Sequence, residues 1–152
     1  MNHYSAPTSF EHSIIINAPI EYVWDALTDI EQMKAWMGEP EMALQIDVDW
    51  VIGSPIVVRG VHHASFKNTG MVLAFEPETC LAYTHLSSLS RLPDKPSSYT
   101  TLEFRTATVN DATSLKLRAS GFPTASIFKH LEFYWRGTLE ILKRHVGRRR
   151  IS

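Results

Sequence analysis

The chain has 152 residues, of which 44% are hydrophobic and 11% aromatic, and its formal net charge at pH 7 is −1. A chain of this length is typical of one domain and can bury a sizeable core. The near-neutral charge gives no reason to expect a nucleic-acid partner or a membrane surface. We expect a single domain at 11–147, a disordered segment at 1–10 and a basic, solvated tail at 148–152.

The single cysteine, Cys80, cannot form an internal disulfide, and no cysteine spacing indicates a zinc site. No segment has the pattern of a signal peptide, and no apolar run approaches the roughly 18 residues of a membrane span. We therefore expect a cytoplasmic protein with Cys80 as a small buried hydrophobe. No cofactor is expected. No metal is expected either, because His62 and His63 are neighbours and would point to opposite faces of a strand.

The first third of the chain predicts a strand followed by two short helices. Residues 11–17 are rich in β-branched side chains, which favour a strand. Pro19 suits the first turn of a helix that carries an apolar stripe. Asp29, with Gln32 three residues later, resembles a capping box and predicts that a second helix begins at once. Gly38 is expected to end it.

Six further extended segments follow, separated by turns that contain Pro, Gly, Asn or Asp. They are residues 43–48, 56–59, 70–75, 81–86, 98–108 and 114–120. Residues 64–66 are expected to form a hairpin turn. The short connections favour antiparallel neighbours, and apolar residues alternate with charged ones in the last two segments. This pattern predicts a sheet with one dry face and one wet face.

Apolar residues at helical spacing predict a long helix from about residue 124 to 146. At this length it spans roughly 34 Å, enough to cross the dry face of the sheet. Gly137 in its middle costs about 1 kcal/mol relative to alanine, which indicates close packing or room for a neighbouring group. The order of elements predicts an α+β fold in which a seven-stranded, curved antiparallel sheet surrounds the C-terminal helix. A pocket is expected between the two.

Four segments carry a family resemblance and follow one another in the family's order. They are Asn-Ala-Pro at 17–19 with Val-Trp-Asp-Ala-Leu-Thr-Asp at 23–29 and Trp36, Gly-Met-Val-Leu-Ala-Phe-Glu-Pro at 70–77, Leu-Ala-Tyr-Thr-His at 81–85, and Trp-Arg-Gly-Thr-Leu-Glu-Ile-Leu-Lys at 135–143. The chain thus resembles the START/Bet v 1-like (SRPBCC) superfamily, and within it the Hsp90-ATPase-activator-homologue (AHSA1-like) group. The resemblance implies the helix-grip fold. Many members of this superfamily bind hydrophobic ligands, and some are cyclases or hydrolases.

The chain departs from the family pattern at two positions. His85 stands where the family often has tryptophan, and Tyr134 stands where a glycine usually precedes the helical tryptophan. Both fall at positions that are expected to line the pocket, so they are expected to reshape it.

The pocket is expected to have a helix wall and a sheet wall, with His85 as its polar handle. Trp36 is expected to close the mouth, and the long loop at 87–98 is a candidate lid or partner surface. The ten residues expected to bind a ligand are Trp36, Val72, Tyr83, His85, Leu102, Phe104, Leu117, Ile127, Leu131 and Trp135.

Three functions are compatible with this sequence. The first is non-catalytic binding of a small hydrophobic or amphipathic molecule in the internal pocket. The second is cyclase or hydratase chemistry, with His85 as a weak catalytic candidate helped by Tyr83 or Arg59. Arg59, Asp47 and Asp49 are alternatively candidates for a buried ion pair or an acid site. The third is a co-chaperone-like interaction module, which predicts a filled pocket and an exposed apolar patch. None of the three excludes a homodimer.

Overall fold

The computed structural model describes residues 8–151, with side chains for residues 8–149. The strands form one antiparallel sheet in the spatial order β1-β7-β6-β5-β4-β3-β2. They are β1 (Ser9–Ile16), β2 (Gln45–Val48), β3 (Pro55–His62), β4 (Ala64–Glu76), β5 (Cys80–Ser87), β6 (Thr100–Val109) and β7 (Ala112–Ser120). The helices are α1 (Ile20–Thr28), α2 (Ile30–Met37) and α3 (Ala125–Ile151), with short 3-10 helices η1 (Pro40–Met42), η2 (Ser88–Ser90) and η3 (Pro96–Ser98) in the connections.

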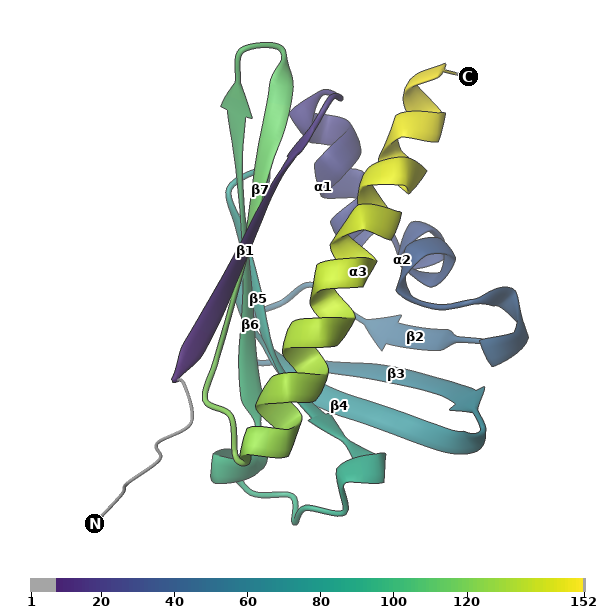
Figure 1. Ribbon diagram of the computed structural model, residues 1–152, viewed down its shortest axis with the longest axis vertical. Helices are drawn as coiled ribbons and strands as arrows, with labels where there is room; N and C mark the ends of the chain where they lie inside the picture. Colours follow the sequence, from purple (N-terminus) through teal and green to yellow (C-terminus); the bar gives the residue numbers. More distant parts are fainter. Residues whose placement is uncertain (1–7, 152) are drawn as a thin grey trace.

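The sheet is curved, and all three α-helices lie on its inner face (Figure 1). The helix α3 crosses that face diagonally, β2, β3 and β4 curl beneath it, and α1 and α2 lie against its C-terminal half. The curvature follows from the twist between adjacent strands, which accumulates over a sheet of this width. This arrangement is the α+β helix-grip fold that the sequence predicts.

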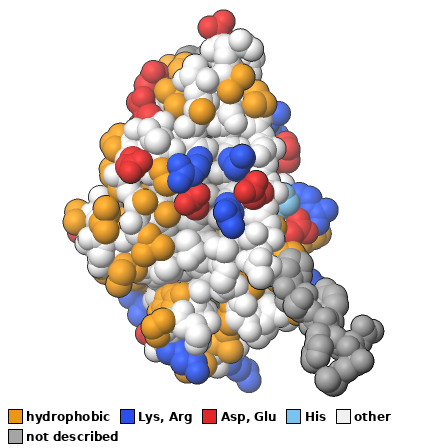
Figure 2. All heavy atoms as spheres, turned by 90° about the vertical axis from the view of Figure 1, so that its left-hand side faces the viewer, with side chains coloured by type: hydrophobic (Ala, Val, Ile, Leu, Met, Phe, Trp, Pro, Cys, Tyr) orange, Lys and Arg blue, Asp and Glu red, His pale blue; other side chains and the backbone are white. Residues whose placement is uncertain are grey.

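The alternation of apolar and charged side chains along the strands decides which face of the sheet is buried. On β6 and β7 the large apolar side chains that point inward have an exposed fraction of at most 1%, and they are Leu102, Phe104, Leu115 and Leu117. Their neighbours along each strand point outward and form a cluster of mixed charge in the middle of the outer face (Figure 2), together with Glu11 of β1. These outward residues are Glu103, Arg105, Lys116 and Arg118. The predicted dry and wet faces are therefore confirmed.

Two tryptophans from outside α1 satisfy the carbonyl groups at its C-terminal end. The indole Nε1 of Trp36 donates to the carbonyl of Ala26 at 2.7 Å, and Nε1 of Trp50 donates to the carbonyl of Thr28 at 2.8 Å. The last carbonyls of a helix have no partner within the helix, so a buried helix end needs donors of this kind. These bonds fix α1 relative to α2 and to the β2–β3 connection.

The helix α2 is held at both ends. As predicted, it begins after Asp29, whose carboxylate accepts a hydrogen bond from the backbone N–H of Gln32 at 3.1 Å. At the other end, the hydroxyl of Tyr134 donates to the carbonyl of Met37 at 2.8 Å. Tyr134 belongs to α3, so this bond joins the end of α2 to the long helix.

The N-terminal strand begins earlier than the sequence indicates. The structure includes Ser9 and Phe10 in β1, because the buried ring of Phe10 packs against the rings of Phe122 and Phe128. The expectation of disorder up to residue 10 is therefore wrong for these two residues. For residues 1–7 it lies outside the described part of the chain.

The C-terminal helix continues past residue 146, so the expected basic tail begins as helix, with the side chain of Arg149 exposed. Its guanidinium lies 2.9 Å from the carboxylate of Asp25 and 4.1 Å from the ring centre of Tyr22. An ion pair and a cation–π contact with α1 together keep this last part of α3 folded against the protein.

The strand β4 is about twice as long as the sequence indicates, because the predicted turn at 64–66 is part of it. The hairpin instead turns at His63, which has a positive φ of 64°. The first half of β4 is largely polar and small, so it lacks the apolar alternation by which a strand is recognised.

Two glycines differ in how much space an added side chain would find. A side chain on Gly70 would lie 1.7 Å from the carbonyl oxygen of Thr84 on β5, shortly before the irregularity in the β4–β5 pairing between Val72 and Ala74. A side chain on Gly137 would meet nothing within 4 Å, because this residue is on the exposed side of α3. The expectation that close packing explains Gly137 is therefore wrong.

We expect opposite effects of alanine at these two positions. Gly70→Ala should lower the free energy of unfolding by about 3 kcal/mol, because the methyl group collides with backbone that cannot move without breaking strand pairing. Gly137→Ala, the matched control, should raise it by up to about 1 kcal/mol through helix propensity alone. Urea denaturation of both variants measures this, and equal effects would contradict the close approach of β4 to β5.

Candidate functional site

A cavity of about 450 Å³ lies between the inner face of the sheet and the first half of α3. This volume falls within the range of known small-molecule sites. The mouth lies where lining residues are exposed to solvent, at Leu89 in η2 and at Ser126 and His130 near the start of α3. The cavity is therefore internal but open to solvent at one end.

The wall formed by α3 comes from three successive turns of the helix. Its residues recur at intervals of three and four, as expected for one face of a helix. They are Ser126, Ile127, His130, Leu131, Tyr134 and Trp135. Met37 at the end of α2 continues this wall, next to Tyr134, which bonds its carbonyl.

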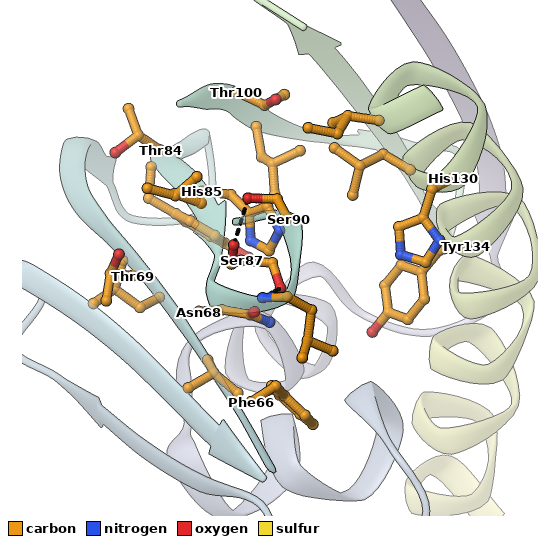
Figure 3. Close-up of a pocket in the computed structure, with 18 of the residues that line it drawn as sticks. Phe66, Asn68, Thr69, Thr84, His85, Ser87, Ser90, Thr100, His130 and Tyr134 are labelled. Atoms are coloured by element: carbon orange, nitrogen blue, oxygen red, sulfur yellow. Dashed lines mark hydrogen bonds between the residues drawn. The ribbon is translucent and has the colours of Figure 1, made fainter. Parts of the chain in front are cut away.

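The opposite wall comes from β3, β4, β5 and β6, and it is divided between apolar and polar residues. The apolar part includes Ile56, Val58, Phe66, Leu86 and Leu102. The polar part includes Asn68, Thr69, Tyr83, Thr84 and His85. Figure 3 shows Asn68 and His85 on the sheet side and His130 and Tyr134 on the helix side, facing one another across the cavity.

The cavity ends at Trp135. Its ring packs edge-on against Phe104, with the ring centres 5.4 Å apart, and lies 6.1 Å from the ring of Trp36. Beyond this point the inward residues of α3 belong to the filled core, and they are Leu139, Leu142 and Val146. The interior is thus filled beneath the second half of α3 and hollow beneath the first half.

Six of the ten residues that the sequence suggests as ligand-binding line this cavity. They are Tyr83, His85, Leu102, Ile127, Leu131 and Trp135. The other four, Trp36, Val72, Phe104 and Leu117, are buried elsewhere. Whether the six bind a ligand stays a prediction.

The four residues outside the cavity lie behind its wall for identifiable reasons. Trp36 cannot close the mouth, because its indole is 3% exposed and is held by the carbonyl of Ala26. Phe104 and Leu117 are paired across β6 and β7 beneath the filled half. Val72 is fully buried in β4, and its backbone bonds to the loop that precedes β3.

His85 is a neutral imidazole at neutral pH. Burial, and to a smaller degree repulsion by His130, lowers the pKa of His85 from its usual 6.5 to about 4. The imidazole makes no hydrogen bond with any residue in the described part of the chain. A neutral histidine offers one donor and one acceptor, so both are free to contact a molecule in the cavity.

Two more polar groups near His85 lack a partner among the described residues. The hydroxyl of Tyr83 makes no hydrogen bond there, and burial raises its pKa, so it stays a neutral phenol. The side-chain oxygen of Asn68 is buried and unbonded. Asn68 pairs with Ser87, two residues from His85 on the neighbouring strand, so these side chains share one face of the sheet.

Other polar residues of the wall are already bonded within the protein. The hydroxyl of Thr84 accepts from the backbone N–H of Met71 at 2.9 Å, and Tyr134 donates to α2. Ser90 donates to the carbonyl of Ser87 at 2.7 Å (Figure 3). Asn68, Tyr83 and His85, which have no such bond, lie on the two neighbouring strands β4 and β5 of the sheet wall.

Sequence reasoning did not identify Asn68 or His130 as pocket residues. The strand that carries Asn68 was expected to begin at residue 70, although Phe66, Asn68 and Gly70 have the spacing of one strand face. His130 lies one turn before Tyr134, whose departure from the family pattern pointed to this face. The loop at 87–98, expected as a lid or partner surface, does contribute Leu89 and Ser90 to the cavity wall.

The remaining sequence candidates do not form a chemical site. Arg59 pairs with Asp47 at 3.2 Å, but the pair is exposed on the β2–β3 hairpin and is not buried as one hypothesis suggested. Within the described residues, no three His, Cys, Asp or Glu side chains gather as metal ligands. In the same part of the chain, no helix is both long and apolar enough to cross a membrane. Cys80 is buried and unpaired, as expected.

Several solved structures share this architecture. CV1439 from Chromobacterium violaceum is 18% identical, with a TM-score of 0.79 over 92% of this chain and 97% of the other. ChR145 from Cytophaga hutchinsonii is 28% identical, with a TM-score of 0.78 over 98% and 100% of the two chains. CalU16 from Micromonospora echinospora is 20% identical, with a TM-score of 0.68 over 94% and 78%.

Comparison with curated proteins gave no match. A family model described as activator of Hsp90 ATPase homolog 1-like protein matches residues 17–147, from the end of β1 into the last part of α3. The matched residues include both walls of the cavity. The chain therefore belongs to the activator of Hsp90 ATPase homolog 1-like family, within the START/Bet v 1-like superfamily.

Proposed function

We propose that this protein binds a small amphipathic molecule non-covalently in the cavity between the sheet and α3. The observation that carries the proposal is the composition of the cavity wall, which has large apolar residues on both α3 and the sheet and unpartnered polar groups on β4 and β5. Burial of apolar surface contributes about 25 cal/mol per Å², and a few polar groups set the orientation of the ligand.

The apolar part of the wall suits the body of such a molecule. Leu102, Leu131 and Trp135 are each at most 4% exposed to solvent although they border the cavity. A ligand there would touch Ile127 and Leu131 on the helix side and Leu102 on the sheet side. Desolvation of these residues would drive association without a covalent step.

An enzymatic function has less support. A general acid or base works best when its pKa lies near the working pH, and that of His85 is about 4. Tyr83 is a neutral phenol, and Arg59 lies on an exposed hairpin away from the cavity. Tyr83 and His85 do line the cavity together, but neither has a pKa suited to proton transfer near neutral pH, and Arg59 does not join them.

A co-chaperone-like role would act through the surface and would predict a filled interior. The cavity of about 450 Å³ speaks against that expectation. Exposed apolar residues do occur on β4 and in the loop before β3, and they are Val51, Ile52, Met71 and Leu73. This group alone does not specify a partner protein.

Filling part of the cavity should weaken ligand binding without unfolding the protein. N-phenyl-1-naphthylamine, an uncharged probe that fluoresces in apolar sites, should bind to the parent protein. Ile127→Trp should raise its Kd at least about tenfold, because the indole occupies cavity volume. Ile141→Trp, on an exposed position of the same helix, should bind as the parent does. Equal Kd values for both variants, or no binding to the parent protein, would contradict the proposed function.

The low pKa of His85 should reduce stability in acid. Between pH 6.5 and 4 the unfolded state binds a proton that the folded state does not, so the free energy of unfolding falls as the pH falls. The loss due to His85 is at most about 3 kcal/mol. The measurement is chemical denaturation of the parent and of His85→Asn at several pH values.

The comparison with His85→Asn is needed because burial also lowers the pKa of His145. Both proteins retain His145, so only the difference between their pH profiles reports on His85. The stability of His85→Asn relative to the parent should rise as the pH falls from 6.5 to 4. Parallel profiles for the two proteins would show that His85 is not buried as described.

A further inference from the structure

Resting on the proposed function, we infer that the ligand is an uncharged molecule whose hydrogen-bonding head, such as a hydroxyl or phenol, is bound by Asn68, Tyr83 and His85. These three residues of the sheet wall would recognise the head group of the ligand and so determine its chemical class.

The first observation is the absence of permanent charge. None of the described residues that line the cavity is Asp, Glu, Lys or Arg. A charged group moved from water into such a site loses its hydration and gains no counterion, and this cost opposes binding. The lining therefore selects against carboxylates, phosphates and ammonium groups in the interior.

The titratable residues of the lining do not replace a permanent charge. Burial keeps Tyr83 and Tyr134 as neutral phenols by raising their pKa values, and it keeps His85 neutral by lowering its own. His130 is exposed at the mouth, so solvent screens any charge that it carries. The deep part of the cavity is uncharged at neutral pH.

The second observation is the set of unpartnered hydrogen-bonding groups in that uncharged wall. The side-chain oxygen of Asn68 is buried with no partner in the described protein, and leaving such a group unbonded is costly. Exchanging the oxygen and nitrogen of the amide would leave a donor in place of an acceptor, and the ligand must supply a hydrogen bond in both cases.

The three groups together form a neutral receptor. Tyr83 and His85 are two residues apart on β5, and Asn68 lies on the adjacent strand with its side chain on the same face. The Tyr83 hydroxyl and the His85 imidazole can each donate and accept. A hydroxyl, which also donates and accepts, can satisfy these groups, whereas a carboxylate can only accept.

The test compares ligands that differ only in the head group. At pH 7.5, calorimetry measures binding of 4-phenylphenol, biphenyl, biphenyl-4-carboxylate and biphenyl-4-methylammonium to the full chain. A flexible series of decanol, decanoate and decylammonium is measured in parallel. We expect the phenol or decanol to bind at least tenfold more tightly than the charged members of its series, and 4-phenylphenol to bind more tightly than biphenyl.

Variants assign the preference to this wall. Asn68→Leu and His85→Phe should each weaken 4-phenylphenol about fivefold to tenfold and leave biphenyl unchanged, because each removes about one hydrogen bond. His62→Phe, at an exposed position on β3, is the matched control and should change neither Kd. Circular dichroism confirms that each variant is folded.

The outcomes separate the two proposals. A carboxylate or ammonium that binds as tightly as the phenol or alcohol overturns the uncharged-ligand proposal and leaves the binding function intact. Equal loss of phenylphenol and biphenyl affinity in Asn68→Leu and His85→Phe overturns the assignment to these residues. If no member of either series binds, the proposed function itself fails.

Discussion

The interior of this protein changes from filled to hollow at one side chain, the indole of Trp135. It packs against Phe104 and Trp36 on one side and borders the cavity on the other. Aromatic rings bury large area and do not compress, so this contact sets how closely α3 can approach the sheet. The curvature of the sheet then leaves a cavity beneath the first three turns of α3, bordered by the rings of Tyr83 and Tyr134.

The short helices keep this geometry in place. Carbonyl groups at the ends of α1 and α2 accept hydrogen bonds from Trp36, Trp50 and Tyr134, which come from α2, the β2–β3 connection and α3. Tyr134 has two roles, since it borders the cavity and also holds the end of α2. Tyr134, which departs from the family pattern, therefore forms part of the cavity wall and also holds the neighbouring end of α2 in place.

Particular residues show how far the sequence could predict the site. Local patterns predicted Tyr83 and His85 on one strand face and Ile127, Leu131 and Trp135 on one helix face, because periodicity depends only on neighbouring residues. The same patterns could not separate Phe104, in the filled half, from Leu102, at the cavity. Both are buried on β6, but the ring of Phe104 packs against Trp135 in the filled half, whereas Leu102 borders the cavity.

The sequence by itself determined the α+β order of elements and the face of each long element that points inward, since apolar spacing and turn residues act locally, and its resemblance to a known family indicated the helix-grip fold. Tertiary structure alone decided where the inside is hollow, that its lining carries no permanent charge, and that Asn68 joins Tyr83 and His85. These properties depend on strand register and on the approach of α3 to the sheet, which bring together residues far apart in the chain.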